Sequence, residues 1–269
     1  MDGNYQLKVG LLLLLGVIII AIFAPVFATN DPKALGSQTI SPPSFQHYLG
    51  TDDLGRDVYS MIIYGTRVSL TVGVAAALIS AVIGVIFGAF AGYFGGKLDK
   101  ILNELNNIFI MLPSFFLVLI IIALFGSSLL NVMLVIGITS WPSNAKLMRA
   151  QAMSLRERTY IKSSLAIGES RTSIVFRYII PNGVFPVIAN TTMEIGGAIL
   201  TEASLSFLGL GDPNTISWGQ LINQGKGYLL NGWWVSTFSG IAILLLVFIF
   251  YFLGDGISVQ MNPKDTGRG

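Results

Sequence analysis

Long hydrophobic runs without charged residues dominate the chain. Residues 9–28, 68–96 and 227–254 contain no Asp, Glu, Lys or Arg, and each is long enough for a helix to cross a bilayer, which takes roughly 20 residues. Residues 105–145 form a run of about twice that length, with a turn signal at residues 126–128 (Gly-Ser-Ser). A further apolar region lies between Arg177 and Asp212 and is interrupted only by Glu194 and Glu202. The pattern predicts six transmembrane helices.

The composition agrees with this pattern. Of the 269 residues, 53% are hydrophobic and 11% are charged, and the mean hydropathy is +0.70, whereas soluble domains carry about 25% charged residues. The expected fold class is therefore an all-α integral membrane protein, which excludes most soluble enzymes. The chain has no cysteine and one histidine, His47, so disulfides, thiolate metal sites and multi-histidine metal sites within it are excluded.

The charges are distributed unevenly between the two sides. If the N-terminus is inside, 12 of the 16 Lys and Arg residues fall in inner segments, which predicts that both termini are cytoplasmic. The first apolar run is longer than that of a usual signal peptide, so we interpret it as a span. Two long loops are expected, an outer loop at residues 29–67 and an inner loop at residues 146–177 with a net charge of +5.

The chain lacks the usual motifs of catalysis. It has neither the phosphate-binding pattern Gly-x-x-x-x-Gly-Lys-Ser/Thr nor a nucleophile elbow, so we expect no cofactor in this chain, and any ATP and Mg²⁺ must be bound by a partner. His47 is interpreted as an ordinary loop residue. Asp52, Asp53 and Asp57 lack the alternating spacing of a calcium loop, and helix capping or turn formation is the simpler interpretation. No metal site is expected.

Glycines recur at every fourth position in the second run. Small residues on one face of a helix allow another helix to approach closely. The two alternatives are an interface with a second chain and packing within this subunit, and the second is favoured. The residues concerned are Gly84, Gly88, Gly92 and Gly96.

Glu194 and Glu202 lie within the fifth predicted span. A carboxylate in hydrocarbon is costly and by default marks a pathway or a buried pair. For Glu194, a role in the translocation pathway and a structural hydrogen bond remain open alternatives. For Glu202, which is nearer the outer end, a structural role is favoured.

Motifs in the loops resemble those of a known family. Residues 160–168 (Tyr-Ile-Lys-Ser-Ser-Leu-Ala-Ile-Gly) and 178–182 (Tyr-Ile-Ile-Pro-Asn) resemble the cytoplasmic loop of binding-protein-dependent ABC importer permeases, with the family's spacing from Gly168 to Pro181. Further strings resemble the C-type permease of the dipeptide, oligopeptide and nickel subfamily. They are residues 50–60 with 64–70, residues 202–211 with 217–219, and residues 253–256 with 262–263. The similarity covers nearly the whole chain.

The resemblance implies an ATPase-coupling loop that folds as two short helices at an angle, with Gly168 at the bend and Pro181 at the start of the fifth span. One departure is that Lys162-Ser163-Ser164 stands where the family has Glu-Ala-Ala, so we expect a complementary acid on the partner ATPase. The residues of this loop that we assign to coupling are Lys162, Ser163, Ser164, Gly168, Glu169 and Pro181.

The implied function is that of a permease subunit of an ATP-driven importer of di- or oligopeptides. Its partners would be a second permease, two ATPase subunits and an external solute-binding protein, in a bacterial or archaeal cell membrane. The same architecture could instead take up nickel or metallophore chelates. A self-contained secondary transporter and a membrane-embedded hydrolase are remote alternatives.

The expected organisation has three parts. Residues 1–66 form an N-terminal transmembrane helix and external loop. Residues 67–256 form the permease core, with the coupling loop at residues 155–181, and residues 257–269 form a cytoplasmic tail.

Overall fold

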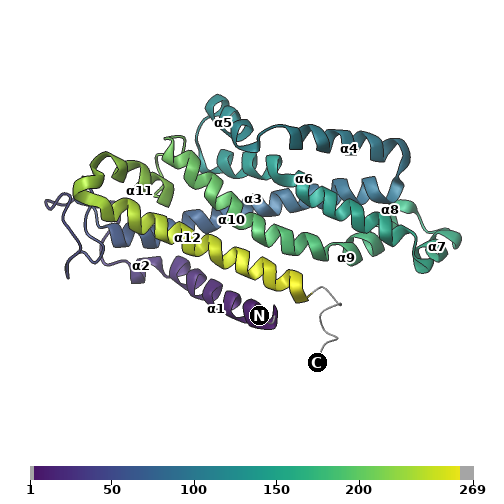
Figure 1. The fold of residues 1–269 in the computed structure, drawn as a ribbon, viewed down its shortest axis with the longest axis horizontal. Coiled ribbons are helices and arrows are strands. Elements are labelled where there is room, and N and C mark those ends of the chain that lie inside the picture. Colours follow the sequence, from purple (N-terminus) through teal and green to yellow (C-terminus); the bar gives the residue numbers. More distant parts are fainter. Residues whose placement is uncertain (1–2, 261–269) are drawn as a thin grey trace.

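The computed structural model describes residues 3–260, which form helices and loops without a β-strand. The long helices lie side by side in an elongated bundle (Figure 1). They are α1 (Gly3–Ile22), α3 (Val58–Phe94), α4 (Gly96–Met111), α5 (Ser114–Phe125), α6 (Leu129–Arg156), α10 (Phe185–Phe207) and α12 (Leu229–Gln260). The short segments are α2 (Ala24–Phe27), α7 (Thr159–Ala166), α8 (Arg171–Ile174), a π-helical turn (Val175–Ile179), α9 (Ile180–Gly183), α11 (Trp218–Gly225) and a 3₁₀ turn (Lys226–Tyr228).

Helix α3 is the central element of the bundle. It packs against α6 and α10, and its buried side chains enter three separate apolar clusters. Val58 and Met61 pack with α10, α11 and α12, Val72 and Ala76 pack with α5 and α6, and Ala89 packs with the region around α7 to α9. A single long helix therefore ties the two ends of the molecule together.

The two ends of the bundle carry different elements. The loop between α2 and α3 lies at one end together with α11, whereas α7, α8 and α9 lie at the other (Figure 1). Helix α1 begins, and α12 ends, toward the end that carries α7. The arrangement agrees with the predicted grouping of the segments into two sides.

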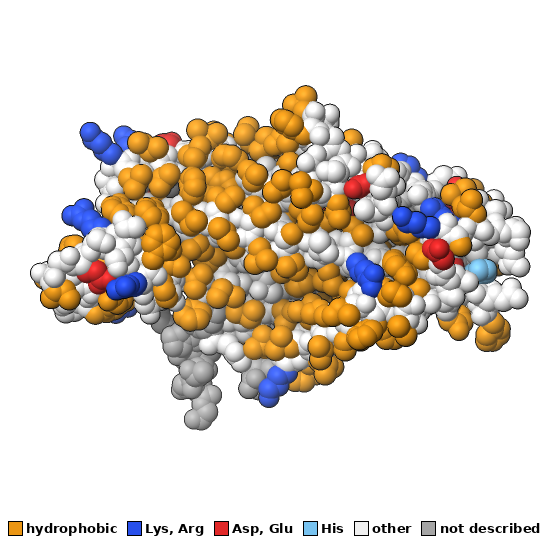
Figure 2. Space-filling model, turned by 180° about the vertical axis from the view of Figure 1, so that it is seen from behind, with side chains coloured by type: hydrophobic (Ala, Val, Ile, Leu, Met, Phe, Trp, Pro, Cys, Tyr) orange, Lys and Arg blue, Asp and Glu red, His pale blue; other side chains and the backbone are white. Residues whose placement is uncertain are grey.

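The surface of the bundle is apolar where a bilayer would cover it. On the face shown in Figure 2, hydrophobic side chains cover the middle of the molecule, and most charged side chains lie toward the two ends. Exposed residues such as Leu12, Leu124 and Leu244 are between 65% and 75% accessible. Such exposure is expected of a membrane-embedded surface, because lipid solvates these side chains.

Length and composition identify between three and five membrane spans among the described residues. Among the described residues, three segments are long and apolar enough to cross a membrane alone: Tyr5–Ile22, Val58–Phe94 and Trp218–Gln260. The total is five if each of two bent helix pairs counts as one span. Helix α6 is 28 residues long, but its second half carries polar residues such as Asn144 and Lys146. Six spans therefore stay a prediction.

The predicted turn between two helices in residues 105–145 is confirmed, and a second break was not predicted. Helix α5 ends before Gly126, which has a φ of +90°, and Ser128 caps α6 by accepting a hydrogen bond from the Asn131 amide at 3.2 Å. In addition, α4 and α5 meet at 85° around Leu112 and Pro113. Proline lacks an amide proton and keeps the preceding residue extended, so it ends α4 there.

Two expected boundaries were wrong. The outer loop was expected to reach residue 67, but α3 begins at Val58, because the Asp57 carboxylate accepts a hydrogen bond from the Ser60 amide at 2.9 Å and caps the helix. The domain boundary expected after residue 66 therefore falls inside α3. The expected tail begins within α12, which continues to Gln260, and residues 261–269 lie outside the described part.

Three of the four recurring glycines pack within this subunit. A Cβ atom on Gly84 would lie 2.5 Å from the Asn144 Cβ, and one on Gly88 or Gly92 would overlap a backbone carbonyl oxygen of α6. Gly96 does not join them, since it starts α4 with a φ of +58° and has open space around it. The contact between α3 and α6 therefore depends on glycine at three positions, and Gly96 serves the turn.

Candidate coupling and translocation sites

The segment after α6 folds as two short helices with a glycine between them. Helix α7 (Thr159–Ala166) closes with hydrogen bonds from the Gly168 and Glu169 amides to the Leu165 and Ser164 carbonyls, both at 3.1 Å. Gly168 has a φ of +92°, with nothing within 4 Å of a Cβ placed there. The positive φ, rather than a close contact, is what requires glycine at this position. The expected bend at Gly168 is confirmed.

Two ion pairs stabilise this segment from within the chain. Lys162 Nζ lies 3.0 Å from a Glu157 carboxylate oxygen, and this hydrogen bond lowers the pKa of the exposed Glu157. Glu169 accepts a hydrogen bond from the Ser173 hydroxyl at 2.7 Å and lies 3.7 Å from Arg177. An acid on a partner would have to compete with Glu157 for Lys162, so the acid expected on the ATPase stays a prediction.

Helix α7 buries one side and exposes the other. Ile161 is 2% accessible and packs in the cluster beneath the helix, whereas Leu165 and Ile167 are 44% and 84% accessible. Ser163 is also exposed, and the half-buried Ser164 donates its hydroxyl to the Tyr160 carbonyl within the helix at 3.0 Å. The helix is thus anchored to the bundle and presents an apolar surface at the end of the molecule.

Pro181 was expected to start the long fifth helix, but it does not. It lies in the first turn of α9 (Ile180–Gly183), and the long helix α10 begins four residues later, at Phe185. The segment from α8 to α9 meets α10 at 62°. Pro186 lies in the first turn of α10, where a missing amide proton costs no helical hydrogen bond.

Glu194 lies at the centre of a polar cluster formed by α3, α6 and α10. One carboxylate oxygen accepts hydrogen bonds from Ser80 Oγ at 2.9 Å and Asn144 Nδ2 at 2.8 Å. The other accepts from Ser143 Oγ at 2.5 Å and Asn190 Nδ2 at 2.9 Å. The sequence left open whether Glu194 makes structural hydrogen bonds, and in the structure it makes them. Because Glu194 is only half-buried and Ser143 is exposed, one side of the cluster is open.

The polar cluster belongs to a longer stripe on α10. Asn190, Glu194, Gly197, Thr201 and Ser204 follow each other at intervals of four and three residues, which places them on one face of the helix. All are half-buried or exposed, and a Cβ on Gly197 would meet nothing within 4 Å. The stripe extends about 21 Å along the axis. Polar side chains within a membrane face protein or water rather than lipid, so this face of α10 needs such a cover.

Glu202 occupies a different environment from Glu194. It is 3% accessible, and one of its oxygens accepts a hydrogen bond from Ser206 Oγ at 2.6 Å. The other oxygen has no hydrogen-bond partner among the described residues. The side chain lies inside the bundle rather than on the open face of α10, which agrees with the structural role that was favoured.

The acids of the loop before α3 make local contacts. His47 Nδ1 lies 2.9 Å from an Asp57 oxygen, and the other Asp57 oxygen caps α3. Asp52 is fully buried and pairs with Arg56. Asp53 accepts a hydrogen bond from the Tyr228 hydroxyl at 3.4 Å. Among the described residues, no three His, Cys, Asp or Glu side chains form a group suited to a metal ion.

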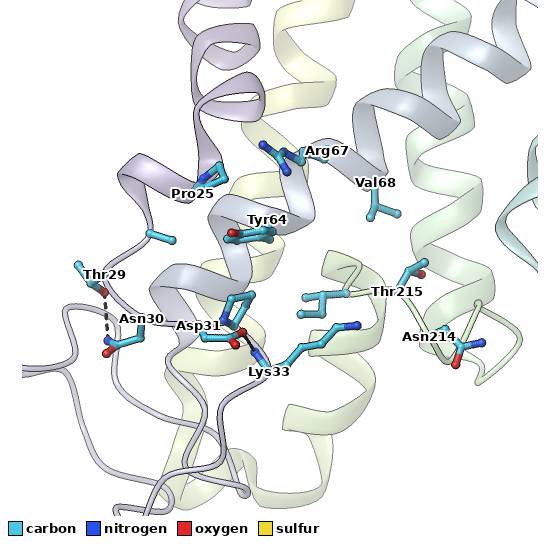
Figure 3. A pocket seen from close by; sticks show the side chains of 13 residues that line it. Pro25, Thr29, Asn30, Asp31, Lys33, Tyr64, Arg67, Val68, Asn214 and Thr215 are labelled. Carbon is cyan, nitrogen blue, oxygen red and sulfur yellow. Dashed lines mark hydrogen bonds between the residues drawn. The ribbon is translucent and has the colours of Figure 1, made fainter.

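A cleft of about 670 Å³ opens beside the C-terminal end of α1 (Figure 3). Tyr64 and Arg67 of α3 line one side, and Lys33 extends across it toward the segment that carries Thr215. Arg67 donates hydrogen bonds to the Ala21 and Ile22 carbonyls at 2.5 and 2.8 Å, and its guanidinium lies 5.4 Å from the centre of the Tyr64 ring. Arg67 thus fastens the last turn of α1 to α3.

Sequence reasoning missed the partners of Glu194. Asn190 lies one helical turn before it, a spacing that could have suggested contact. Ser143 and Asn144 follow Pro142 inside an otherwise apolar run, and two successive polar residues there could have indicated a buried polar site. Ser80 carried no such signal, because a single serine is common in an apolar helix.

A family of transport proteins matches this chain over most of its helical core. The family is described as "Binding-protein-dependent transport system inner membrane component", and its model matches residues 84–264. The chain belongs to this family. The matched region contains α6, the α7–α8 segment and α10, whereas Ser80 of the polar cluster lies before it.

Several relatives resemble this chain over most of their own length. A probable D,D-dipeptide transport system permease of Escherichia coli is 35% identical, over 94% of this chain and 85% of the relative. A dipeptide transport system permease of Alkalihalophilus pseudofirmus is 36% identical, over 95% and 85%. A glutathione transport system permease of Salmonella typhimurium is 40% identical, over 94% and 84%. The chain is therefore an ABC importer permease of the peptide family.

A solved structure supports the fold. The inward-facing methionine ABC transporter MetNI has a chain that superposes with a TM-score of 0.59, covering 74% of this chain and 95% of its own, at 20% sequence identity. A second crystal form gives a TM-score of 0.58 at 22% identity. The likeness shows that the ABC importer permease fold is present.

Proposed function

We propose that this chain forms one half of the membrane pathway of an ATP-driven importer for di- or oligopeptides. The observation that carries this proposal is the 35–40% identity, over 94% of the chain or more, to permeases of dipeptide and glutathione transport systems. A second, related permease supplies the other half, and an external binding protein delivers the solute. The chain is a non-catalytic component, and two separate ATPase subunits supply the energy.

Contact with the ATPase is assigned to the α7–α8 segment. The exposed apolar side chains of α7 offer a docking surface, and Ile161 anchors the helix to the bundle so that a force on it reaches α3 and α6. Lys162, Ser163, Ser164, Gly168 and Glu169 belong to this surface or to its bend. Movement of the ATPase subunits is then transmitted as a rigid-body shift between inward and outward states.

The translocation pathway is assigned to the polar stripe of α10. Glu194 and its neighbours face the second permease or the water-filled space between the two chains, because lipid would leave them unsolvated. In this arrangement α7 and both termini are cytoplasmic, and the loop before α3 meets the binding protein outside. The protein is a multi-pass component of the cell membrane.

Uptake by the reconstituted complex tests this function. Proteoliposomes that contain both permeases and the ATPase subunits, supplied with the binding protein, are expected to take up radiolabelled L-alanyl-L-alanine only when ATP is hydrolysed. The control carries ATPase subunits with their phosphate-binding lysine replaced, and it should take up none. Uptake that proceeds without ATP would indicate a secondary transporter, and absence of uptake of this dipeptide in the intact system would contradict the peptide assignment.

A further inference from the structure

The cleft beside the C-terminal end of α1 carries two cations that form no ion pair with a described residue. Arg67 uses two of its five N–H groups on the Ala21 and Ile22 carbonyls, and its other N–H groups have no acceptor in the described part of the chain. Lys33 extends its ammonium group across the cleft (Figure 3). Among the described residues that line it, Asp31 is the one acid, and its carboxylate accepts from the Lys33 backbone amide at 2.9 Å. Two cations and one carboxylate leave the cleft with a net charge of +1.

The cleft opens at the edge of the apolar part of α3. Arg67 immediately precedes residues 68–96, which contain no charged side chain, and Tyr64 lies one turn before it on the lining of the cleft (Figure 3). Tyrosine and long cationic side chains are typical of this depth, because their apolar parts meet lipid while their polar ends stay in the headgroup layer. The two cations are therefore placed at the level of lipid headgroups.

An exposed apolar stripe on α3 leads away from Arg67. Val74, Leu78 and Val82 follow Arg67 at spacings that place all four residues on one face of the helix, and their side chains are 37%, 57% and 58% accessible. At the helical rise of about 1.5 Å per residue, Val74 and Leu78 lie about 10 and 16 Å from Arg67 along the axis. One leaflet contributes about 15 Å of hydrocarbon, half of the core. The acyl chains of a lipid held at Arg67 therefore reach both residues.

We propose that this cleft binds the phosphate group of an anionic phospholipid, in the leaflet on the side of α11, with its acyl chains along Val74 and Leu78. The free N–H groups of Arg67 suit phosphate oxygens, and Lys33 adds a second positive charge. A phospholipid with one negative charge, such as phosphatidylglycerol, neutralises the net charge of the cleft. Phosphatidylcholine carries its own cation, which Lys33 repels. The proposal holds for any solute that the importer carries.

Fluorescence quenching at position 78 tests this selection where the acyl chains would lie. A fluorescent non-canonical amino acid replaces Leu78 in the complete permease–ATPase complex, which is placed in nanodiscs of phosphatidylcholine. Phosphatidylglycerol with brominated acyl chains is then compared with phosphatidylcholine carrying the same chains, each at increasing mole fraction. One favourable charge near a membrane surface corresponds to about fivefold in affinity, so phosphatidylglycerol should reach half-maximal quenching at about a fivefold lower mole fraction.

Three variants at exposed positions tie the preference to the cleft without disturbing the bundle. Lys33→Gln brings the net charge of the cleft to zero and should abolish the preference for phosphatidylglycerol. Asp31→Asn keeps an oxygen that can accept from the Lys33 amide but raises the net charge to +2, so it should increase the preference by about a further fivefold. Lys226→Gln is the matched control, because it removes a lysine that does not line the cleft, and it should leave the preference unchanged.

Several outcomes would overturn the lipid site. Equal quenching by the two lipids, or a preference that survives Lys33→Gln, would show that the cleft does not select the headgroup. Quenching by neither lipid would show that protein, such as the second permease, covers this face of α3. Millimolar glycerol 1-phosphate should not relieve the quenching, because it has the phosphate but no acyl chains. Relief would mean that the cleft takes a free phosphate instead of a lipid.

Discussion

Gly168→Val is expected to abolish the stimulation of ATP hydrolysis by loaded binding protein while leaving the permease inserted in the membrane. Gly168 has a φ of +92°, a conformation that a β-branched residue adopts only with strain of about 1 to 3 kcal/mol. The strain is relieved by turning α8 relative to α7 or by unwinding the end of α7. Either change displaces the exposed Leu165 and Ile167, and we expect stimulated hydrolysis to fall by about tenfold or more.

Two controls separate coupling from a general loss of stability. Gly168→Asn should retain most of the stimulation, because asparagine tolerates the left-handed region. Gly16→Val places the same side chain on the exposed face of α1, where nothing lies within 4 Å, and should behave as wild type. Ser164→Ala should be mild. If Gly168 only ends α7, then Gly168→Val lowers thermal stability modestly and stimulation remains normal, and that result would refute the coupling assignment.

Gly88→Leu is expected to prevent the permease from folding. A Cβ atom on Gly88 already overlaps the Ala145 carbonyl oxygen and would lie 2.8 Å from the Met148 Cβ, so a leucine cannot fit unless α3 and α6 separate. Overpacking of a tight core typically costs 1 to 3 kcal/mol, and here the clash is with backbone that cannot rotate away. Size-exclusion chromatography of a fluorescent fusion in detergent should show the monodisperse peak reduced to background.

The matched control for this variant is Gly16→Leu, which adds the same side chain to a lipid-facing position. It should give a normal peak. Gly88→Ala should lie between the two, because it introduces only the first atom of the clash. Equal peaks for Gly88→Leu and Gly16→Leu would show that α3 and α6 do not pack through this glycine face.

The sequence predicted those features that depend on composition and local backbone chemistry. The apolar runs predicted the long helices, and the segment at residues 126–128 predicted the turn before α6, whereas the bend at Gly168 between two short helices was expected from the family resemblance, and the positive φ that glycine permits is its physical basis. These features follow from side-chain hydrophobicity or from the φ that a glycine permits, and both are readable one residue at a time.

Other features depend on contacts between distant residues, and the sequence did not reveal them. The start of α3 at Val58 depends on the capping carboxylate of Asp57; helix capping was one interpretation of the three acids, but the sequence did not show which of them ends the loop. Three of the four partners of Glu194 come from helices 50 or more residues away, so no local spacing identifies Ser80 or Asn144. The break at Pro113 was readable in principle, but the surrounding apolar run concealed it.

Crosslinking from α7 is the most direct test of the claim that this chain is driven by a separate ATPase. The chain has no cysteine, so a single cysteine can be placed at Leu165, which is 44% accessible, or at Phe45, which is fully accessible at the opposite end. A photoactivated crosslinker at position 165 should capture the ATPase subunit, whereas one at position 45 should not. An impermeant maleimide should label intact cells at position 45 only. Labelling of position 165 from outside, or capture of the ATPase from position 45, would contradict the account.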